Sequence, residues 1–183
     1  MKNKFPRETL LEHCKDIKEF LDTKHPECIE SVEIVGSLRR GLQECGDIDL
    51  IIVPKFEKQD ALFGGPTLLP LTDSIEWDKY AEIVKNGTKY TQLVKLLGPY
   101  RLNIDIYIAV EPEKYGVLKV IRTGPESFNK KYCVPKHLGG KLPQGFVVDD
   151  GYLLNNGEVV PCHTELDYFK AIGVEYIKPK DRI

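Results

Sequence analysis

The stretch from Asp47 to Val53 constrains the fold of this chain more than any other segment. It reads Asp-Ile-Asp-Leu-Ile-Ile-Val and is entirely apolar after Asp49. An apolar run of this kind is typical of a central strand whose two faces are both covered. The rest of the chain therefore has to supply the cover for both faces of the sheet in which this strand lies.

Two carboxylates stand at the head of this strand. Because side chains alternate along a strand, Asp47 and Asp49 point to one face while Ile48 points into the core. Two like charges this close together are costly unless a cation lies between them. Hard oxygen ligands of this type suit Mg2+. The sequence therefore predicts a divalent-metal site at the start of the strand.

A turn of small and basic residues precedes the carboxylates. Gly36 and Ser37 follow an apolar strand expected at 31–35, and they can offer backbone N–H groups and a hydroxyl to an anion at a helix start. Arg40 adds a charged fork that suits phosphate, or else it is an ordinary solvated charge. A metal site beside a phosphate-binding turn is typical of active sites for phosphoryl or nucleotidyl transfer.

A third carboxylate lies on a later strand, expected at 102–110. Its polar face carries Asp105, and its other face is apolar, with Leu102, Ile104, Ile106 and Ile108. If the sheet places this strand beside that of Asp47 and Asp49, three carboxylates meet and can share two metal ions. The alternative is that Asp105 is an ordinary polar residue on a solvated strand face.

Periodicity and breaker residues predict the remaining elements. Helices are expected over four ranges: 7–23, 76–86, 111–122 and 126–132. Residues 55–75 contain Gly64-Gly65-Pro66 and Pro70 and are expected to form a loop. Thr164 is expected to cap a last helix.

Composition narrows the class of protein. The 183 residues form one large domain or two small ones, with the hydrophobic (42%) and charged (30%) content of a soluble globular protein. No apolar run has the length of a membrane span, and no signal peptide is evident, so we expect a cytoplasmic location. The five cysteines are expected to be reduced thiols. They form no Cys-x-x-Cys pair, and the four histidines show no metal-ligand spacing, so no zinc site is expected.

The net charge and the local distribution of lysines give opposite indications about nucleic-acid binding. The net charge of −2 argues against a strongly basic binding surface. A local basic segment is nevertheless present, with Lys130, Lys131, Lys136 and Lys141. These lysines either form a solvated loop or contact nucleic acid.

The segment Gly36-Ser37, Arg40-Gly41, Asp47-x-Asp49 resembles the signature of nucleotidyltransferases of the DNA polymerase beta superfamily, with a spacing similar to that of family X DNA polymerases. The resemblance continues through Thr123-Gly124 to a Pro-Lys-Asp-Arg close at residues 179–182. It implies an α+β fold, with a palm of mixed β-sheet flanked by helices over residues 1–111 and a small thumb over 112–183. The lyase and fingers regions of the family have no counterpart in this sequence. This layout of palm and thumb alone is similar to that of small viral members of the family. The alternatives to a cytoplasmic location are therefore the nucleus or a viral or phage factory.

The resemblance also implies a role for each position of the motif. Asp47 and Asp49 would hold two Mg2+ ions (Mn2+ being the alternative metal), and Asp105 would ligate the catalytic one and take the proton of the attacking 3′-hydroxyl. The positions implied to contact the nucleoside triphosphate are Gly36, Ser37, Arg40, Gly46, Ile121, Arg122, Thr123, Gly124 and Asn129. The implied partner is primer–template or gapped DNA, bound by a monomer.

Departures from the family pattern keep alternatives open. Ile121-Arg122 replaces the Tyr-Phe often found before Thr-Gly, which leaves the choice between dNTP and NTP open. Cys133 stands where a basic residue is usual, and Arg122 serves either as a phosphate ligand or as a cation at a helix C-terminus. One alternative function is a template-independent nucleotidyltransferase acting on an RNA end, a protein or a small molecule. The other is a nucleotide- or nucleic-acid-binding module without turnover.

Overall fold

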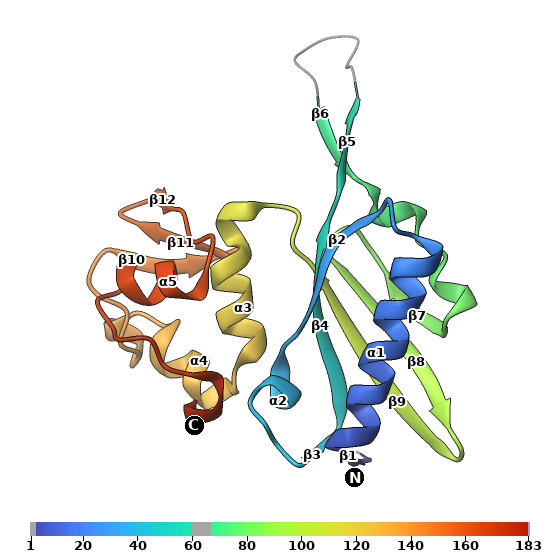
Figure 1. Ribbon diagram of the computed structural model, residues 1–183. Helices are drawn as coiled ribbons and strands as arrows, with labels where there is room; N and C mark the ends of the chain where they lie inside the picture. The colour runs from blue at the N-terminus through green and yellow to red at the C-terminus, as the bar shows by residue number, and fades with distance from the viewer. Residues whose placement is uncertain (1–2, 60–66, 183) are drawn as a thin grey trace. The chain divides into compact units, whose positions relative to one another are not determined.

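The computed structural model describes residues 3–59 and 67–182 (Figure 1). The chain divides into two compact units, each of which is discontinuous in sequence. The first unit joins Met1–Ile34 to Gln43–Val110, and the second joins Val35–Leu42 to Glu111–Ile183. Within the described ranges, no helix has both the length and the apolar character that crossing a membrane requires.

A five-stranded mixed sheet forms the first unit, with strand order β2-β4-β9-β8-β7 (Figure 1). The strands are β2 (Ile29–Ile34), β4 (Asp47–Pro54), β7 (Glu82–Asn86), β8 (Tyr90–Leu97) and β9 (Tyr100–Ile108). β4 and β9 run parallel, and the other neighbours are antiparallel. Helix α1 (Arg7–Lys24) packs against β2 and β4, and its buried stripe consists of Leu10, Cys14, Ile17 and Leu21. The predicted α+β fold, with a mixed sheet flanked by helices, is confirmed.

The two strands that carry the carboxylates have the burial that their sequences predict. On β4, the consecutive residues Leu50, Ile51 and Ile52 are fully buried, which requires that both faces of the strand are covered. On β9, burial alternates: Leu102, Ile104 and Ile106 are buried, whereas the residues between them are only half-buried. One face of β9 is therefore available to present polar groups.

Two predictions for residues 55–86 are wrong. The loop expected at 55–75 contains an antiparallel pair, β5 (Phe56–Gln59) with β6 (Thr67–Pro70), followed by the 3-10 helix η1 (Leu71–Ser74). Its Gly64-Gly65-Pro66 segment lies outside the described residues.

The helix expected at 76–86 is limited to one 3-10 turn, η2 (Trp77–Lys79), after which β7 adds an edge strand to the sheet. Pairing with β8 outweighs the helical spacing of the apolar residues, because Ile83 and Val84 are β-branched residues that suit a strand. A further short pair, β1 (Phe5–Pro6) with β3 (Glu44–Cys45), lies at the start of α1.

The second unit consists of short helices and a small antiparallel sheet around a core of its own. Its elements are α2 (Gly36–Arg39), η3 (Pro112–Lys114), α3 (Tyr115–Thr123), α4 (Glu126–Tyr132), η4 (Lys136–Leu138), β10 (Phe146–Asp149), β11 (Tyr152–Asn155), β12 (Glu158–Val160), α5 (Glu165–Ala171) and η5 (Pro179–Asp181). The core includes Val117, Val120, Phe128, Leu153, Tyr168 and Phe169. Thr164 caps α5 through a reciprocal capping box with Asp167, which confirms the predicted cap.

Candidate active site

Three aspartates share one face of the sheet in the first unit. Asp49 and Asp105 are direct partners in the parallel β4–β9 pair, and Asp47, two residues before Asp49, pairs with Asn103. All three aspartates are half-buried, whereas Ile48 is fully buried on the opposite face. Because neighbouring strands lie about 4.8 Å apart, the carboxylates of Asp49 and Asp105 project side by side. The strand pairing thus brings together the carboxylates that the sequence singled out.

The neighbouring strand β8 holds Asp105 in position. Gln92 is the register partner of Asp105, and its Nε2 donates a hydrogen bond of 3.0 Å to Asp105 Oδ1. The hydroxyl of Tyr90 donates to the same oxygen. Both donors engage Oδ1, so together they fix the plane of the carboxylate and direct Oδ2 elsewhere. The sequence reasoning missed Tyr90 and Gln92, although their alternation on a strand next to that of Asp105 is a usable signal.

The Gly-Ser turn belongs to the second unit. Gly36 has a φ of +62°, a conformation that favours glycine, and it opens the single-turn helix α2. The Oγ atom of Ser37 is buried and has no hydrogen-bond partner among the described residues. Arg40 donates through Nη1 to the carbonyl oxygen of Thr123. Gly46 lies in the first unit, between β3 and β4.

The segment from Ile121 to Gly124 ends α3 and meets α4 through Asn129. Asn129 Nδ2 donates a hydrogen bond of 2.8 Å to the carbonyl oxygen of Ile121, and Asn129 Oδ1 is buried without a partner in the described part of the chain. Gly124 has a φ of +55°, and a Cβ built there would lie 3.5 Å from Arg40 Nη1. The structure therefore groups Arg40, Thr123, Gly124 and Asn129.

Ile121 and Arg122 are placed differently from that group. The Ile121 side chain packs against the core of the second unit. Arg122 is exposed in the last turn of α3, where a cation compensates the helix dipole.

A buried ion network joins three segments of the second unit, and the sequence reasoning missed it. Glu165, at the start of α5, accepts two hydrogen bonds from Arg39, at 2.8 Å (Nη1 to Oε1) and 2.5 Å (Nη2 to Oε2). Arg182 lies on the other side, with Nη1 2.9 Å from Glu165 Oε1. Arg39 also donates to Thr123 Oγ1 at 2.5 Å. The network ties α2 and the C-terminal segment to the end of α3.

The charges of this network control the ionisation of Glu165. Burial alone raises the pKa of its carboxyl group, but the hydrogen bonds and positive charges of Arg39 and Arg182 outweigh burial and lower that pKa. Arg182 is itself packed between two rings, with its guanidinium carbon 5.1 Å from the Phe128 centroid and 5.4 Å from the Phe169 centroid. No sequence signal connects Arg39 to a partner 126 positions away.

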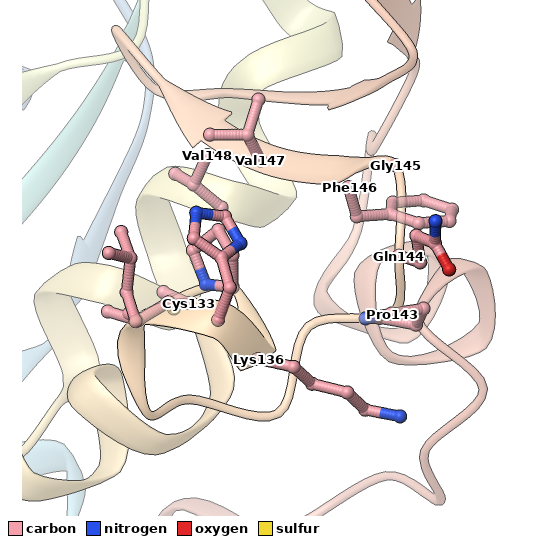
Figure 2. A pocket seen from close by; sticks show the side chains of 12 residues that line it. Cys133, Lys136, Pro143, Gln144, Gly145, Phe146, Val147 and Val148 are labelled. Carbon is pink, nitrogen blue, oxygen red and sulfur yellow. The ribbon is translucent and has the colours of Figure 1, made fainter.

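The four lysines of the basic segment are all exposed. Lys130 forms an ion pair of 2.6 Å with Glu126. Lys131 and Lys141 both lie over the ring of Tyr132, at 5.2 Å and 6.0 Å from its centroid. Lys136 lines a cavity of about 820 Å³ formed by the segments 133–138 and 143–148 (Figure 2).

The fold and the carboxylates together define a palm of the nucleotidyltransferase type. The family profile of the DNA polymerase beta palm matches residues 4–98, more than half of the 183 residues, and the chain belongs to this family. Rat (Rattus norvegicus) DNA polymerase lambda is 29% identical over an alignment of 163 residues, and this alignment covers 80% of this chain and 28% of that protein. The chain therefore corresponds to less than a third of the length of this relative.

Membership of the palm family implies a nucleotidyltransferase. Members of the family typically use divalent metal ions. The distant similarity to DNA polymerase lambda agrees with the resemblance to family X in the motif at residues 36–49.

Proposed function

We propose that this protein is a DNA polymerase of family X that adds a deoxynucleoside monophosphate to a primer 3′-hydroxyl and fills gaps during DNA repair. The register pairing of Asp49 with Asp105, with Asp47 on the same face, carries the proposal. A protein that only binds nucleotides has little use for three clustered carboxylates, because their mutual repulsion is costly without a cation. The similarity to rat DNA polymerase lambda supports the polymerase assignment.

The carboxylate face fits Mg2+ by the chemistry of its donors. Asp47, Asp49 and Asp105 offer hard oxygen ligands, the type that Mg2+ prefers. Asp47 and Asp49 would hold two ions, Mg2+ or Mn2+, and Asp105 would ligate the one at the primer end. When bound, the ions would supply charge neutralisation at the attacking hydroxyl and the leaving pyrophosphate.

Asp105 has a second role in this proposal, as acceptor of the proton that leaves the 3′-hydroxyl. The hydrogen bonds from Tyr90 and Gln92 to Oδ1 leave Oδ2 as the oxygen for this task. They also hold the carboxylate plane before substrate arrives, so that no reorganisation is needed at the moment of reaction. Tyr90 and Gln92 thus act as positioning residues.

The residues of the second unit would bind the nucleotide, together with Gly46 of the first. Gly36, Ser37 and Arg40 would contact the triphosphate, the backbone of 121–124 the sugar, and Asn129 the base. Two buried oxygens support this part of the proposal, Ser37 Oγ and Asn129 Oδ1, because neither has a hydrogen-bond partner among the described residues. Leaving a buried polar group unpaired costs about 1–3 kcal/mol, and a bound nucleotide would provide the missing donors and acceptors.

We further propose that residues 1–111 act as palm and residues 112–183 as thumb. The exposed Lys130, Lys131, Lys136 and Lys141 would then contact the DNA backbone, where a cation replaces condensed counterions. A template-independent nucleotidyltransferase is the second candidate. It is favoured by Cys133, which is uncharged and half-buried at a position where the resemblance to the family leads us to expect a basic residue.

Extension of a labelled primer at a one-nucleotide gap tests the proposal. The purified chain receives each dNTP separately with Mg2+, and Asp105→Asn serves as the inactive variant. Addition of the complementary nucleotide alone supports a template-reading polymerase. Addition of every nucleotide, whether or not it is complementary, contradicts the template-reading polymerase and supports the template-independent nucleotidyltransferase. If no nucleotide is added to DNA or RNA ends, with either dNTPs or NTPs, both candidate functions are contradicted.

A further inference from the structure

A second group of metal-binding side chains lies in the first unit, where α1 ends and β2 begins. His25, Glu27 and Cys28 each offer one ligand atom, and these atoms all lie within 4.8 Å of one another. His25 and Cys28 are buried, at 5% and 0% exposure, and Glu27 reaches them from the surface. The sequence reasoning missed this group, because the spacing His-x-Glu-Cys is not one of the familiar zinc patterns.

The backbone holds these side chains together independently of any ion. The amide of Cys28 donates to the carbonyl oxygen of His25 at 3.0 Å, which closes a tight turn and returns Cys28 to the side of His25. The carbonyl oxygen of Cys28 in turn accepts from the amide of Lys55 at 2.8 Å. The His25 ring packs against Phe20, with ring centroids 5.3 Å apart. The site is therefore preorganised by α1, β2 and the segment after β4.

The donor types select the metal. A thiol, an imidazole and a carboxylate are the ligands of Zn2+, whereas Mg2+ takes hard oxygen ligands alone. Zn2+ binds these atoms at about 2.0–2.3 Å, so ligand atoms on one ion lie roughly 3–4 Å apart. Cys28 Sγ donates a hydrogen bond to Glu27 Oε1 across 3.3 Å, and the bound ion would replace this shared proton between the two atoms. The Glu76 amide contacts His25 Nε2 at 3.4 Å, a long hydrogen bond whose loss on ring reorientation costs little.

We propose that His25, Glu27 and Cys28 bind one Zn2+ ion, with water as the fourth ligand, and that this ion clamps the end of α1 to the start of β2. Binding forms a bond between Zn2+ and the Cys28 sulfur and releases the thiol proton to solvent. Burial, together with the neighbouring Glu27, raises the pKa of this thiol to about 11, so the proton is present at neutral pH until the ion displaces it.

The proposed zinc site is separate from the carboxylate face. Ile29, next to Cys28, pairs with Pro54 at the end of β4, whereas Asp47 and Asp49 stand at its start. Five residues of strand from Asp49 to Pro54 correspond to roughly 16 Å. The two sites also differ in chemistry, so a probe that reports thiolate ligation distinguishes them.

Co2+ provides this probe, because a cobalt–thiolate bond gives an intense charge-transfer absorption. The metal-free chain is titrated with Co2+, and the bound Co2+ is then displaced with Zn2+. Wild type is expected to bind one Co2+ with thiolate absorption and to lose this absorption on addition of Zn2+. Cys28→Ser is expected to abolish the absorption, and Glu27→Gln, a surface change that leaves the core intact, to weaken the affinity at least about tenfold.

Cys14→Ser is the matched control, since it alters another buried cysteine of the same unit. It is expected to keep the absorption and the affinity. The rise in thermal melting temperature on addition of Zn2+ gives a second readout, expected in full in wild type and Cys14→Ser and expected to be smaller in Glu27→Gln at the same Zn2+ concentration. The proposal is overturned if wild type shows no thiolate absorption, if Cys28→Ser retains it, or if Glu27→Gln binds as tightly as wild type.

Discussion

Asp49 on β4 and Asp105 on β9 are register partners on two parallel neighbouring strands, and their side chains point to the same face of the sheet. These two residues are 56 positions apart in the chain, and the sheet places them beside each other without any loop residue taking part. Carboxylates on strands keep their spacing better than carboxylates on loops, because ladder hydrogen bonds on both sides fix the backbone. The proposed nucleotidyl transfer depends on this pair.

Removal of the Tyr90 hydroxyl tests whether positioning of Asp105 matters. Tyr90→Phe deletes one of the two hydrogen bonds to Oδ1 and leaves the aromatic packing against Tyr107 in place. Loss of a group that orients a metal ligand typically costs about 10- to 100-fold in metal affinity or activity. We expect a rise of this size in the Mg2+ concentration that gives half-maximal nucleotidyl transfer. Tyr100→Phe, an exposed tyrosine of the same strand pair, is the control and should behave as wild type.

The Arg39–Glu165–Arg182 network predicts a stability effect. Glu165→Gln removes the negative charge and leaves two guanidinium groups facing a neutral amide, one of them from the fully buried Arg182 side chain. Breaking a buried ion pair by removal of one partner costs about 3–5 kcal/mol. Urea denaturation should show this loss in the free energy of unfolding. Glu158→Gln, at an exposed position of β12, should change it by less than about 0.5 kcal/mol.

The same residue predicts how stability depends on pH. The pKa of Glu165 is lowered from its ordinary value of 4.5, because the arginine contacts outweigh the effect of burial. A carboxyl group with a lowered pKa stabilises the folded state above the unfolded pKa, and this contribution is lost as the pH falls through the folded pKa. Wild type should therefore lose stability below pH 4.5, and Glu165→Gln should show a shallower loss. Equal acid dependence of the two proteins would contradict this assignment.

The capping box of α5 predicts a smaller effect. Thr164 Oγ1 accepts from the Asp167 amide at 3.2 Å, and the Asp167 carboxylate accepts from the Thr164 amide at 2.7 Å. Thr164→Ala should lower the free energy of unfolding by about 1 kcal/mol. Ser127→Ala, inside α4 and exposed, is the comparison and should have a smaller effect. Thermal melts of the three proteins at one pH give the measurement.

Sequence reasoning succeeded where a pattern is local. The apolar run of β4, the alternation of β9 and the stripe of α1 each fix an element through its own residues, and the palm topology followed from the resemblance that the Asp-x-Asp motif carries. The helix prediction failed at 76–86, where three apolar residues have helical spacing. Part of this range forms the edge strand β7, because the fold places β8 beside it as a pairing partner.

Contacts between residues far apart in the sequence could not be predicted, because they depend on which distant segments the fold brings together. Glu165 looks like an ordinary acidic residue in the first turn of a helix, and only the folded chain shows that two arginines surround it. Tyr90 and Gln92 became recognisable once the order β9-β8 was known. Residues that position a ligand from a neighbouring strand can be identified only when the strand order is known, and a single sequence does not give this order.

Nucleotidyl transfer by Asp105→Asn is the most direct test of the central claim. The variant keeps the size of the side chain and removes the charge needed to hold a cation and to accept a proton. We expect primer extension in Mg2+ to fall by roughly 10²–10³-fold or more, with the free energy of unfolding not reduced and with Asp78→Asn, an exposed aspartate of the same unit, fully active. Wild-type extension rates in Asp105→Asn would contradict the assignment of the carboxylate face as the active site.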